Sequence, residues 1–230
     1  MKGHTDRRLS DLVSLFAVAI CLLLPLVCVS ASSEGPRGHR ATSLQSAAIY
    51  KAARLQARLQ QEEKDNWDWF EQQKANFPIF RPTAEDKLVF DVGLYDGADT
   101  QWFLQQGFHV VGVDANPKFV QAAKERFAEH VEAGKLVLLN AGLDEESGKN
   151  MTFYVAKYLP HSSFEFEKAC YTDCQPLDIP VRQCQGLFAF GRPLYLKIDI
   201  EERHYVCVQA LQYLQPELLP KIQRDQGLRE

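Results

Sequence analysis

The sequence lacks the excess of positive charge that nucleic-acid-binding proteins carry. Its 230 residues include 26 Lys and Arg against 30 Asp and Glu, which gives a formal net charge of −4 at pH 7. A protein that binds phosphate groups of nucleic acid needs a basic surface. The composition therefore predicts no nucleic-acid partner, and the length suits one domain with additional segments.

The sequence also lacks histidines at metal-ligand spacing beside its cysteines. Structural zinc sites combine Cys and His at short, regular spacing, so we predict no metal site. Cysteines of a chain in an oxidising compartment form disulfides instead. The cysteines outside the apolar N-terminal run are Cys170, Cys174, Cys184 and Cys207, and the sequence does not assign their pairing.

Charge is absent from the segment LVSLFAVAICLLLPLVCVS, residues 12–30, which follows Lys2, Arg7 and Arg8. A basic flank before an apolar run is typical of a secretory signal, and Val29-Ser30-Ala31 has small residues at cleavage spacing. The run is also near the roughly 18 residues that span a bilayer. Residues 1–31 are therefore predicted to be a cleaved signal peptide or a retained signal anchor.

Either alternative predicts the secretory pathway. An anchored chain would be a single-pass membrane protein with a lumenal body, because basic residues before the span favour a cytosolic N-terminus. A cleaved chain would be secreted. Asn150-Met151-Thr152 is a glycosylation sequon and agrees with both.

Proline and glycine are absent from residues 41–74, which are rich in good helix formers. Residues 32–40 are predicted to be a linker, and residues 41–76 a helical stem. The stem would either form a coiled coil or pack on the following domain through Trp67, Trp69 and Phe70. Lys51 and Glu62 break the heptad pattern, which favours packing.

Apolar runs and helical patterns alternate through residues 77–230. Strands are predicted at 87–93, 109–115, 135–142 and 193–200, with helices at 99–107, 116–134 and about 202–219. A further strand at 151–156 is predicted to be antiparallel or at an edge. This alternation predicts an α/β fold with a parallel sheet covered on both faces.

The stretch FDVGLYDGADT follows the first of these strands. Glycine after a strand lets a ligand approach the backbone, and the next helix directs its free N–H groups at the same place. Asp114 ends the second strand about twenty residues on, where a carboxylate accepts the hydroxyls of a ribose. The spacing predicts a nucleoside-binding site.

The glycine pattern is Gly93-x3-Gly97 and not the G-x-G-x-x-G of dinucleotide folds. Tyr95 would crowd a pyrophosphate and Asp96 would repel it. Acidic residues suit a cationic sulfonium better. A protein that binds NAD(P) is therefore a third alternative, behind the two discussed next.

The first motif resembles "DVGANxGxxT" of the FkbM-type family of S-adenosylmethionine-dependent methyltransferases. Asp91, Gly93, Gly97 and Thr100 match, whereas Tyr95 replaces the usual Asn. The resemblance covers about residues 88–214. It implies a Rossmann-like class I fold, with S-adenosyl-L-methionine as the cofactor.

Two later motifs extend this resemblance. VDANP resembles the family's "xEPNP" and places Asp114 at the ribose, while Asn140 and Ala141 fall where the fold lines the adenine. The resemblance thus implies cofactor binding by a set of residues distributed over three strand ends: Asp91, Gly93, Tyr95, Gly97, Asp114, Asn140 and Ala141.

The third motif, KIDIEE, resembles the family's "KIDxEG", with Glu202 in place of the glycine. Asp199 and Glu201 are the candidates for positioning the acceptor or acting as general base, and Lys197 completes the predicted catalytic set. Lys197 and Asp199 also have a structural interpretation, as a mutual ion pair that closes the strand end. The resemblance implies O-methylation of a small-molecule or glycan hydroxyl, with residues 157–192 as a lid or acceptor-binding insert.

The last residues, KIQRDQGLRE, are polar and without a strand pattern. They predict a class I sheet that is truncated and incomplete on its C-terminal side. Tyr95, Glu202 and this truncation favour the second alternative, a methyltransferase-like binding domain without catalysis.

Overall fold

The computed structural model describes residues 39–83, 86–171, 173–200, 203–213 and 221–224. The chain divides into two compact units, Met1–Ala52 and Ala53–Glu230. The predicted signal or anchor, most of the predicted linker, and Glu201 and Glu202 lie outside the described residues. Within the described ranges, no helix combines the length and apolar character that a membrane span requires.

The second unit is built on a parallel five-stranded sheet. Its strand order is β3-β2-β1-β7-β8. The strands are β1 (Leu88–Val92), β2 (His109–Asp114), β3 (Leu136–Asn140), β7 (Tyr195–Ile198) and β8 (Lys221–Arg224). The α/β class and the parallel sheet are confirmed, and β1 lies at the centre as the first strand of a doubly wound fold does.

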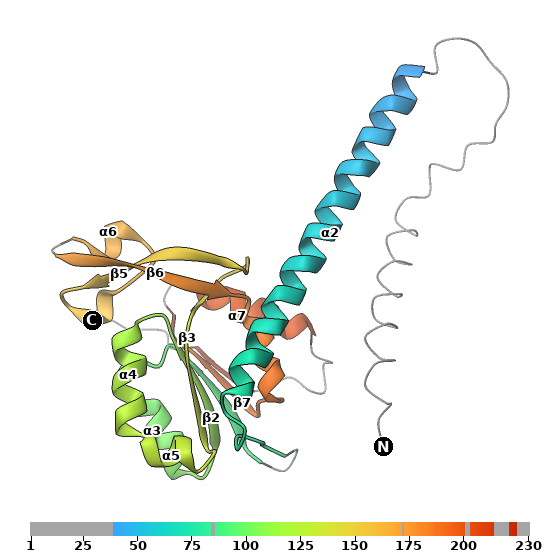
Figure 1. Cartoon of the computed structure of the whole chain (residues 1–230). Coiled ribbons are helices and arrows are strands. Elements are labelled where there is room, and N and C mark those ends of the chain that lie inside the picture. Colours follow the sequence, from blue (N-terminus) through green and yellow to red (C-terminus); the bar gives the residue numbers. More distant parts are fainter. Residues whose placement is uncertain (1–38, 84–85, 172, 201–202, 214–220, 225–230) are drawn as a thin grey trace. The chain divides into compact units, whose positions relative to one another are not determined.

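Helices cover both faces of this sheet (Figure 1). One face packs against α3 (Ala98–Gln105), α4 (Pro117–Arg126) and α5 (Ala128–Glu132). The other packs against the end of α2 (His39–Ala75), the 3₁₀ helix η2 (Cys184–Phe190) and α7 (His204–Ala210), which η4 (Leu211–Tyr213) continues. Buried strands that are apolar on both faces are what such a sheet requires.

The helix predicted at 116–134 is interrupted. Asn116 caps α4 by accepting the Lys118 N–H at 3.1 Å. The helix then ends before Phe127, and the short helix α5 follows. The Phe127 side chain is buried in the core on this face of the sheet, close to Gly97. The helix is therefore interrupted at the residue whose ring packs into the core.

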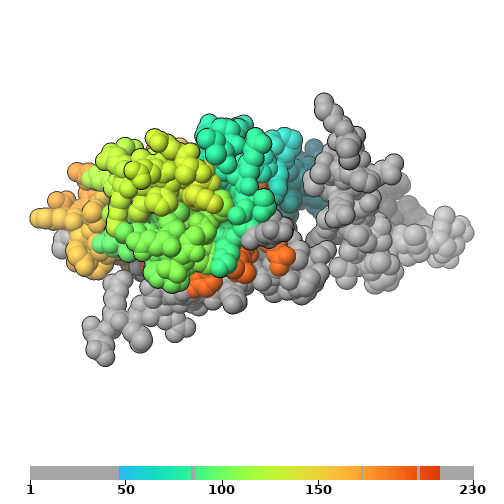
Figure 2. Space-filling view, turned by 90° about the horizontal axis from the view of Figure 1, so that it is seen from below, coloured from blue at the N-terminus to red at the C-terminus, as the bar shows by residue number. Residues whose placement is uncertain are grey.

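A second, three-stranded sheet follows β3 in the chain. Its order is β4-β6-β5, with β4 (Gly142–Leu143), β5 (Lys149–Ala156) and β6 (Cys174–Arg182), and β5 pairs antiparallel with β6. The helices η1 (Leu159–His161) and α6 (Phe166–Ala169) lie between β5 and β6. In Figure 2 the yellow-orange residues of this region project beyond the green body.

Strand β6 was not predicted, and it contains Pro176 and Pro180, which are unfavourable inside a sheet. Strand β4 reaches β6 only at Val181 and Arg182. The two prolines therefore pair with β5 on one side only, where a missing N–H on the other side is tolerated. The predicted antiparallel strand at 151–156 belongs to this second sheet and not to the main one.

The prediction that no strand forms in the last residues is wrong for Lys221–Arg224. This segment forms β8 and pairs in parallel with β7, from Tyr195 opposite Lys221 to Ile198 opposite Arg224. A strand at the end of a sheet pairs through backbone hydrogen bonds on one side, so it forms here without an apolar pattern.

The end of α2 packs on the sheet domain through a buried ring and a buried amide. Phe70 is fully buried, and a Cβ on Gly186 would lie 2.1 Å from its ring. Asn66 accepts hydrogen bonds from Gln183 N and Ser147 Oγ at 2.8 and 3.0 Å. The packing interpretation therefore describes this part of the helix, although Trp67 remains exposed.

Two disulfides are formed, Cys170–Cys174 and Cys184–Cys207. The first joins the end of α6 to the start of β6, and the second joins η2 to α7 in the core. The four cysteines outside the apolar N-terminal run are thus all paired.

Candidate functional site

The loop between β1 and α3 turns through backbone conformations that favour glycine. Gly93 and Gly97 have φ of +87° and +75°. A Cβ on Gly93 would lie 1.9 Å from the backbone oxygen of Asp199, so the loop can approach the end of β7 only without a side chain there. Tyr95 also has a positive φ, 48°, which is unusual for a bulky residue.

The Asp114 carboxylate lies directly beside this loop. Its Oδ2 accepts the Tyr95 N–H at 2.9 Å, and its Oδ1 accepts the Asn116 N–H at 2.7 Å. Burial raises the pKa of Asp114 to about 6, against the lowering effect of these two hydrogen bonds. A carboxylate offers about four lone-pair sites, so it can still accept hydroxyl donors from a ligand.

Asn140 supports the end of β2 from the neighbouring strand. Its Nδ2 donates to the backbone oxygens of Asp114 and Ala115, at 2.9 and 3.0 Å. The side chain therefore fixes the chain around Asp114. Ala141, the next residue, lines the pocket.

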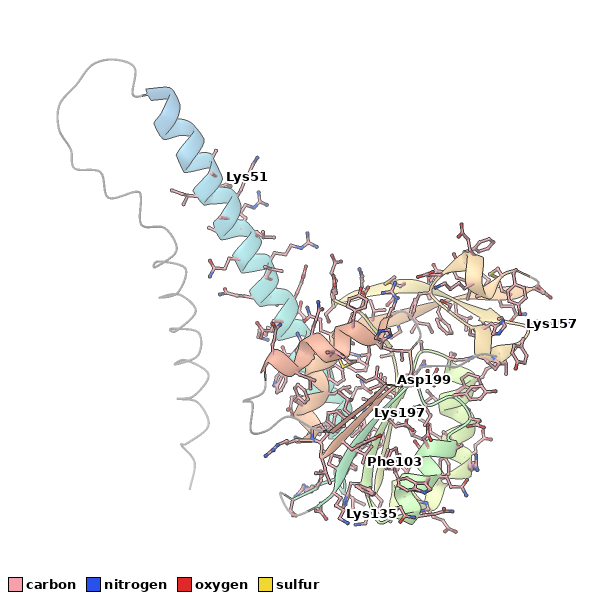
Figure 3. All side chains as sticks on the ribbon, turned by 180° about the vertical axis from the view of Figure 1, so that it is seen from behind. Lys51, Phe103, Lys135, Lys157, Lys197 and Asp199 are labelled. Atoms are coloured by element: carbon pink, nitrogen blue, oxygen red, sulfur yellow. A yellow bond between two sulfur atoms is a disulfide. The ribbon has the colours of Figure 1, made fainter. Side chains whose placement is uncertain are left out.

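Lys197 lies buried under the loop, 5% exposed. Its Nζ donates to the Gly93 oxygen at 2.6 Å and lies 3.0 Å from Asp91 Oδ1 and 3.3 Å from Asp99 Oδ2. Burial by itself lowers the pKa of Lys197, but attraction to Asp91 and Asp99 outweighs it and raises the pKa. The ammonium thus stays charged and holds the loop. Figure 3 places Lys197 within the sheet and Asp199 at its edge.

Asp91 completes this buried group. It is fully buried, and its Oδ2 accepts the Thr100 hydroxyl at 2.6 Å. Two residues of the first sequence motif and the lysine of the last one therefore meet beneath the loop. Their contacts fix the backbone of the site and do not reach the pocket surface.

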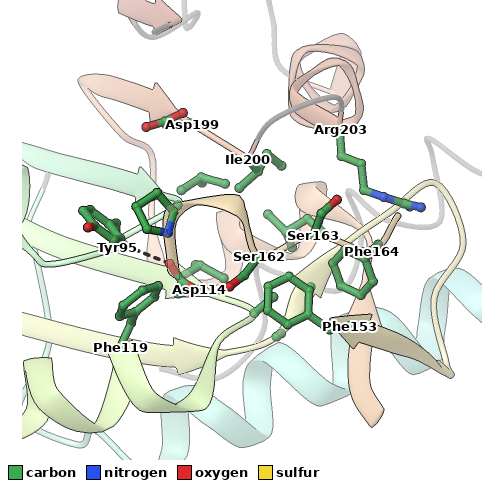
Figure 4. Close-up of a pocket in the computed structure, with 18 of the residues that line it drawn as sticks. Tyr95, Asp114, Phe119, Phe153, Ser162, Ser163, Phe164, Asp199, Ile200 and Arg203 are labelled. Atoms are coloured by element: carbon green, nitrogen blue, oxygen red, sulfur yellow. Dashed lines mark hydrogen bonds between the residues drawn. The ribbon is translucent and has the colours of Figure 1, made fainter. Parts of the chain in front are cut away.

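A pocket of about 200 Å³ opens above the ends of β1, β2 and β7 (Figure 4). Of the predicted residues, Gly93, Tyr95, Asp114, Ala141 and Asp199 line it. Asp91, Gly97, Asn140 and Lys197 are not among the lining residues, and Glu201 lies outside the described residues. Typical sites for drug-sized ligands measure roughly 300–1,000 Å³, so a nucleoside cofactor would have to extend through the mouth.

The second sheet and the loop after β5 supply the opposite wall of the pocket. Phe153, Ser162, Ser163 and Phe164 line the pocket from this side. Ser162 Oγ donates to the Leu159 oxygen at 2.7 Å and accepts the Ala156 N–H at 3.1 Å, which ties the loop to β5. The sequence had singled out His161-Ser162-Ser163 within the expected insert at 157–192, but it gave no signal for Phe153 or Phe164.

Two further lining residues were also missed. Phe119, on α4, makes an edge-to-face contact with Tyr95 at 5.0 Å between ring centroids. Arg203 bonds to Asp144 Oδ1 at 2.8 Å and lies over the Phe164 ring at 5.0 Å. The pocket therefore has an aromatic end at Tyr95 and Phe119, a carboxylate in the middle, and a polar and aromatic wall opposite.

The donor set fits a nucleoside with a positive charge better than a metal ion. Nowhere in the part of the chain that the structure describes do three His, Cys, Asp or Glu side chains gather to hold a metal. Asp114 is available to ribose hydroxyls, the aromatic rings suit a flat base, and Asp199 is a second carboxylate at the carboxyl end of β7.

Comparison with known proteins gives one match of limited extent. Over 67 residues the chain is 40% identical to the ribosomal RNA small subunit methyltransferase H of Gemmatimonas aurantiaca. The match takes in 28% of this chain and 21% of that protein, so the chain spans about a fifth of this relative's length. No protein-family model matches the chain. The match and the parallel sheet together support a methyltransferase-like domain and no narrower family.

Proposed function

We propose that this protein is an S-adenosylmethionine-dependent methyltransferase of the FkbM type. The observation that carries the proposal is Asp114, which lies at the end of β2, lines the pocket and contacts the glycine loop. In a doubly wound sheet, ligands bind at this edge, beyond the carboxyl ends of the strands. The partial likeness to a methyltransferase supports a methyl donor over a dinucleotide.

Asp114 would accept hydrogen bonds from the ribose hydroxyls, and Tyr95 and Phe119 would offer aromatic surface to the base. Gly93 lets the donor approach the backbone, and Lys197 holds that backbone in place through the Gly93 oxygen. When bound, S-adenosylmethionine would supply a methyl group carried on a sulfonium for transfer to an acceptor oxygen. Alignment of donor and acceptor accounts for most of the catalysis in such a displacement.

Asp199 is our candidate for orienting or deprotonating the acceptor hydroxyl. Its side chain is exposed at the pocket, and its backbone oxygen packs against Gly93. Glu201 remains a second candidate from the sequence motif. The acceptor is proposed to be a hydroxyl of a glycan or small molecule, held by the wall that the second sheet provides.

We place the protein in the secretory pathway, either membrane-anchored with a lumenal domain or secreted. The two disulfides support this placement, because disulfides persist in oxidising compartments. The apolar run at residues 12–30 supports it independently.

The competing function is a methyltransferase-like binding domain without catalysis. One observation favours it. Tyr95 adopts a left-handed backbone conformation, which the Asn of the family motif would adopt with less strain. A strained residue at a cofactor loop is consistent with a site that has been adapted to another ligand.

Calorimetric titration of S-adenosylmethionine into the purified protein tests the cofactor site, and a screen of acceptors then separates the two alternatives. We expect saturable binding that Asp114→Ala abolishes and that Asp173→Ala, an exposed carboxylate outside the pocket, leaves unchanged. Binding of NAD(P) alone would contradict the methyltransferase proposal. In a screen of glycans and small alcohols, Asp199→Asn should lower the rate of methyl transfer by about 10²–10⁴-fold. Binding without transfer to any acceptor would favour the non-catalytic domain.

A further inference from the structure

The sequon Asn150-Met151-Thr152 lies on the outer face of β5. Asn150 and Thr152 are both exposed, whereas Phe153 and Val155 on the opposite face are buried, 6% and 5% exposed. Alternation along the strand separates these two sets. Phe153 lines the pocket, so a group attached to Asn150 projects away from the proposed active site.

Strand β5 is also an end strand of its sheet. The order β4-β6-β5 gives it one neighbour, β6. A bridge between Tyr154 and Ser163 covers its other side near the C-terminal end. Along Lys149–Thr152, the described residues place no second strand beside it. An open edge of this kind pairs readily with other chains, and natural proteins cover or block such edges.

We propose that Asn150 carries an N-linked glycan and that this glycan shields the open edge of β5. The inference rests on the secretory placement proposed above. In the reaction, Asn150 Nδ2 bonds to the anomeric carbon of a lipid-diphosphate-linked oligosaccharide. The bond from that carbon to the diphosphate oxygen breaks, the nitrogen loses one proton, and the lipid diphosphate leaves. A glycosyltransferase of the host's lumen catalyses this step.

The surroundings of Asn150 suit the modification. Its partner across the sheet is Pro180 of β6, which is synthesised later, so Asn150 can react before the hairpin closes. Thr152 lies on the same face, with its Oγ 3.4 Å from Asp178 Oδ1. The chain's other asparagines, Asn66, Asn76, Asn116 and Asn140, are not in sequons, so a single glycan is expected.

The test is expression of the full chain in cultured animal cells, followed by treatment with an endoglycosidase that releases N-linked glycans. We expect an increase in electrophoretic mobility equivalent to one glycan. Asn150→Gln and Thr152→Ala should abolish this shift, and Thr152→Ser, which keeps the sequon, should retain it. Asn150→Gln should also lower the soluble fraction of the protein, while S-adenosylmethionine binding by the soluble part stays unchanged.

A second sequon, introduced by substitution, tests whether the chain reaches the lumen. Leu44→Asn forms one with Gln45 and Ser46, in the unit Met1–Ala52. Glycosylation of that site without glycosylation of Asn150 would overturn the inference while leaving the secretory placement intact. Glycosylation of neither site would overturn both. A glycosylated chain whose Asn150→Gln variant is equally soluble would overturn the shielding role.

Discussion

The parallel sheet and the second sheet differ in what holds their residues in place. Beneath the β1–α3 loop, the buried Lys197 is bound to the buried Asp91 and to the backbone oxygen of Gly93. The β5–β6 sheet has a small apolar cluster of Phe153, Val155 and Ile179, and the disulfide Cys170–Cys174 lies close to it in the chain. The cofactor side of the pocket is therefore fixed by a buried polar group. The opposite wall is fixed by a small apolar cluster and by a disulfide that closes a short loop.

The largest effect should come from breaking the buried group. Lys197→Met leaves Asp91 buried without its cation, and we expect the free energy of unfolding to fall by about 3–5 kcal/mol. Urea denaturation measures the loss. Lys118→Met, an exposed lysine on α4, should change stability little. Equal losses from the two substitutions would mean that the buried ion pair does not contribute to the free energy of unfolding.

The two disulfides allow the stability of the two regions to be compared. Cys184–Cys207 closes a separation of 23 residues, whereas Cys170–Cys174 closes one of 4. In the chain-entropy account, replacing the first pair by Ala costs about 3 kcal/mol and the second about 2 kcal/mol. Thermal unfolding of the two double variants checks this order. A larger loss from the shorter loop would show that the second sheet is the more critical region.

The pH dependence of S-adenosylmethionine binding tests Asp114, which lines the pocket at the end of β2. The pKa of Asp114 is raised to about 6 by burial. Because ribose hydroxyls donate to the ionised form, S-adenosylmethionine affinity should fall as the pH drops below this value, by at most about tenfold per pH unit. Titrations above and below pH 6 measure it. Asp114→Asn, which does not ionise, should show no such step.

The smallest effect concerns Tyr95. A left-handed conformation costs roughly 1–2 kcal/mol for most residues, and Asn tolerates it. Tyr95→Asn should therefore stabilise the fold by about 1 kcal/mol, reduced by the lost contact with Phe119. If the ring also flanks the base, S-adenosylmethionine affinity falls at the same time. Unchanged affinity would remove Tyr95 from the binding residues.

The sequence alone determined the parallel sheet and the residues that meet at its edge. Apolar runs that alternate with helical segments specify buried strands, and the ends of parallel strands meet at one edge. Gly93, Asp114 and Asp199 are therefore brought together at the pocket as their positions in the sequence predict.

Only the tertiary structure decided which of these residues face the pocket. Asp91 and Lys197 come from adjacent strands, and their partners depend on the register between β1 and β7, which no local pattern encodes. The second sheet and the pairing of the cysteines depend likewise on contacts between distant segments. Backbone pairing carries little sequence signal, and for this reason β6 and β8 became visible only in the fold.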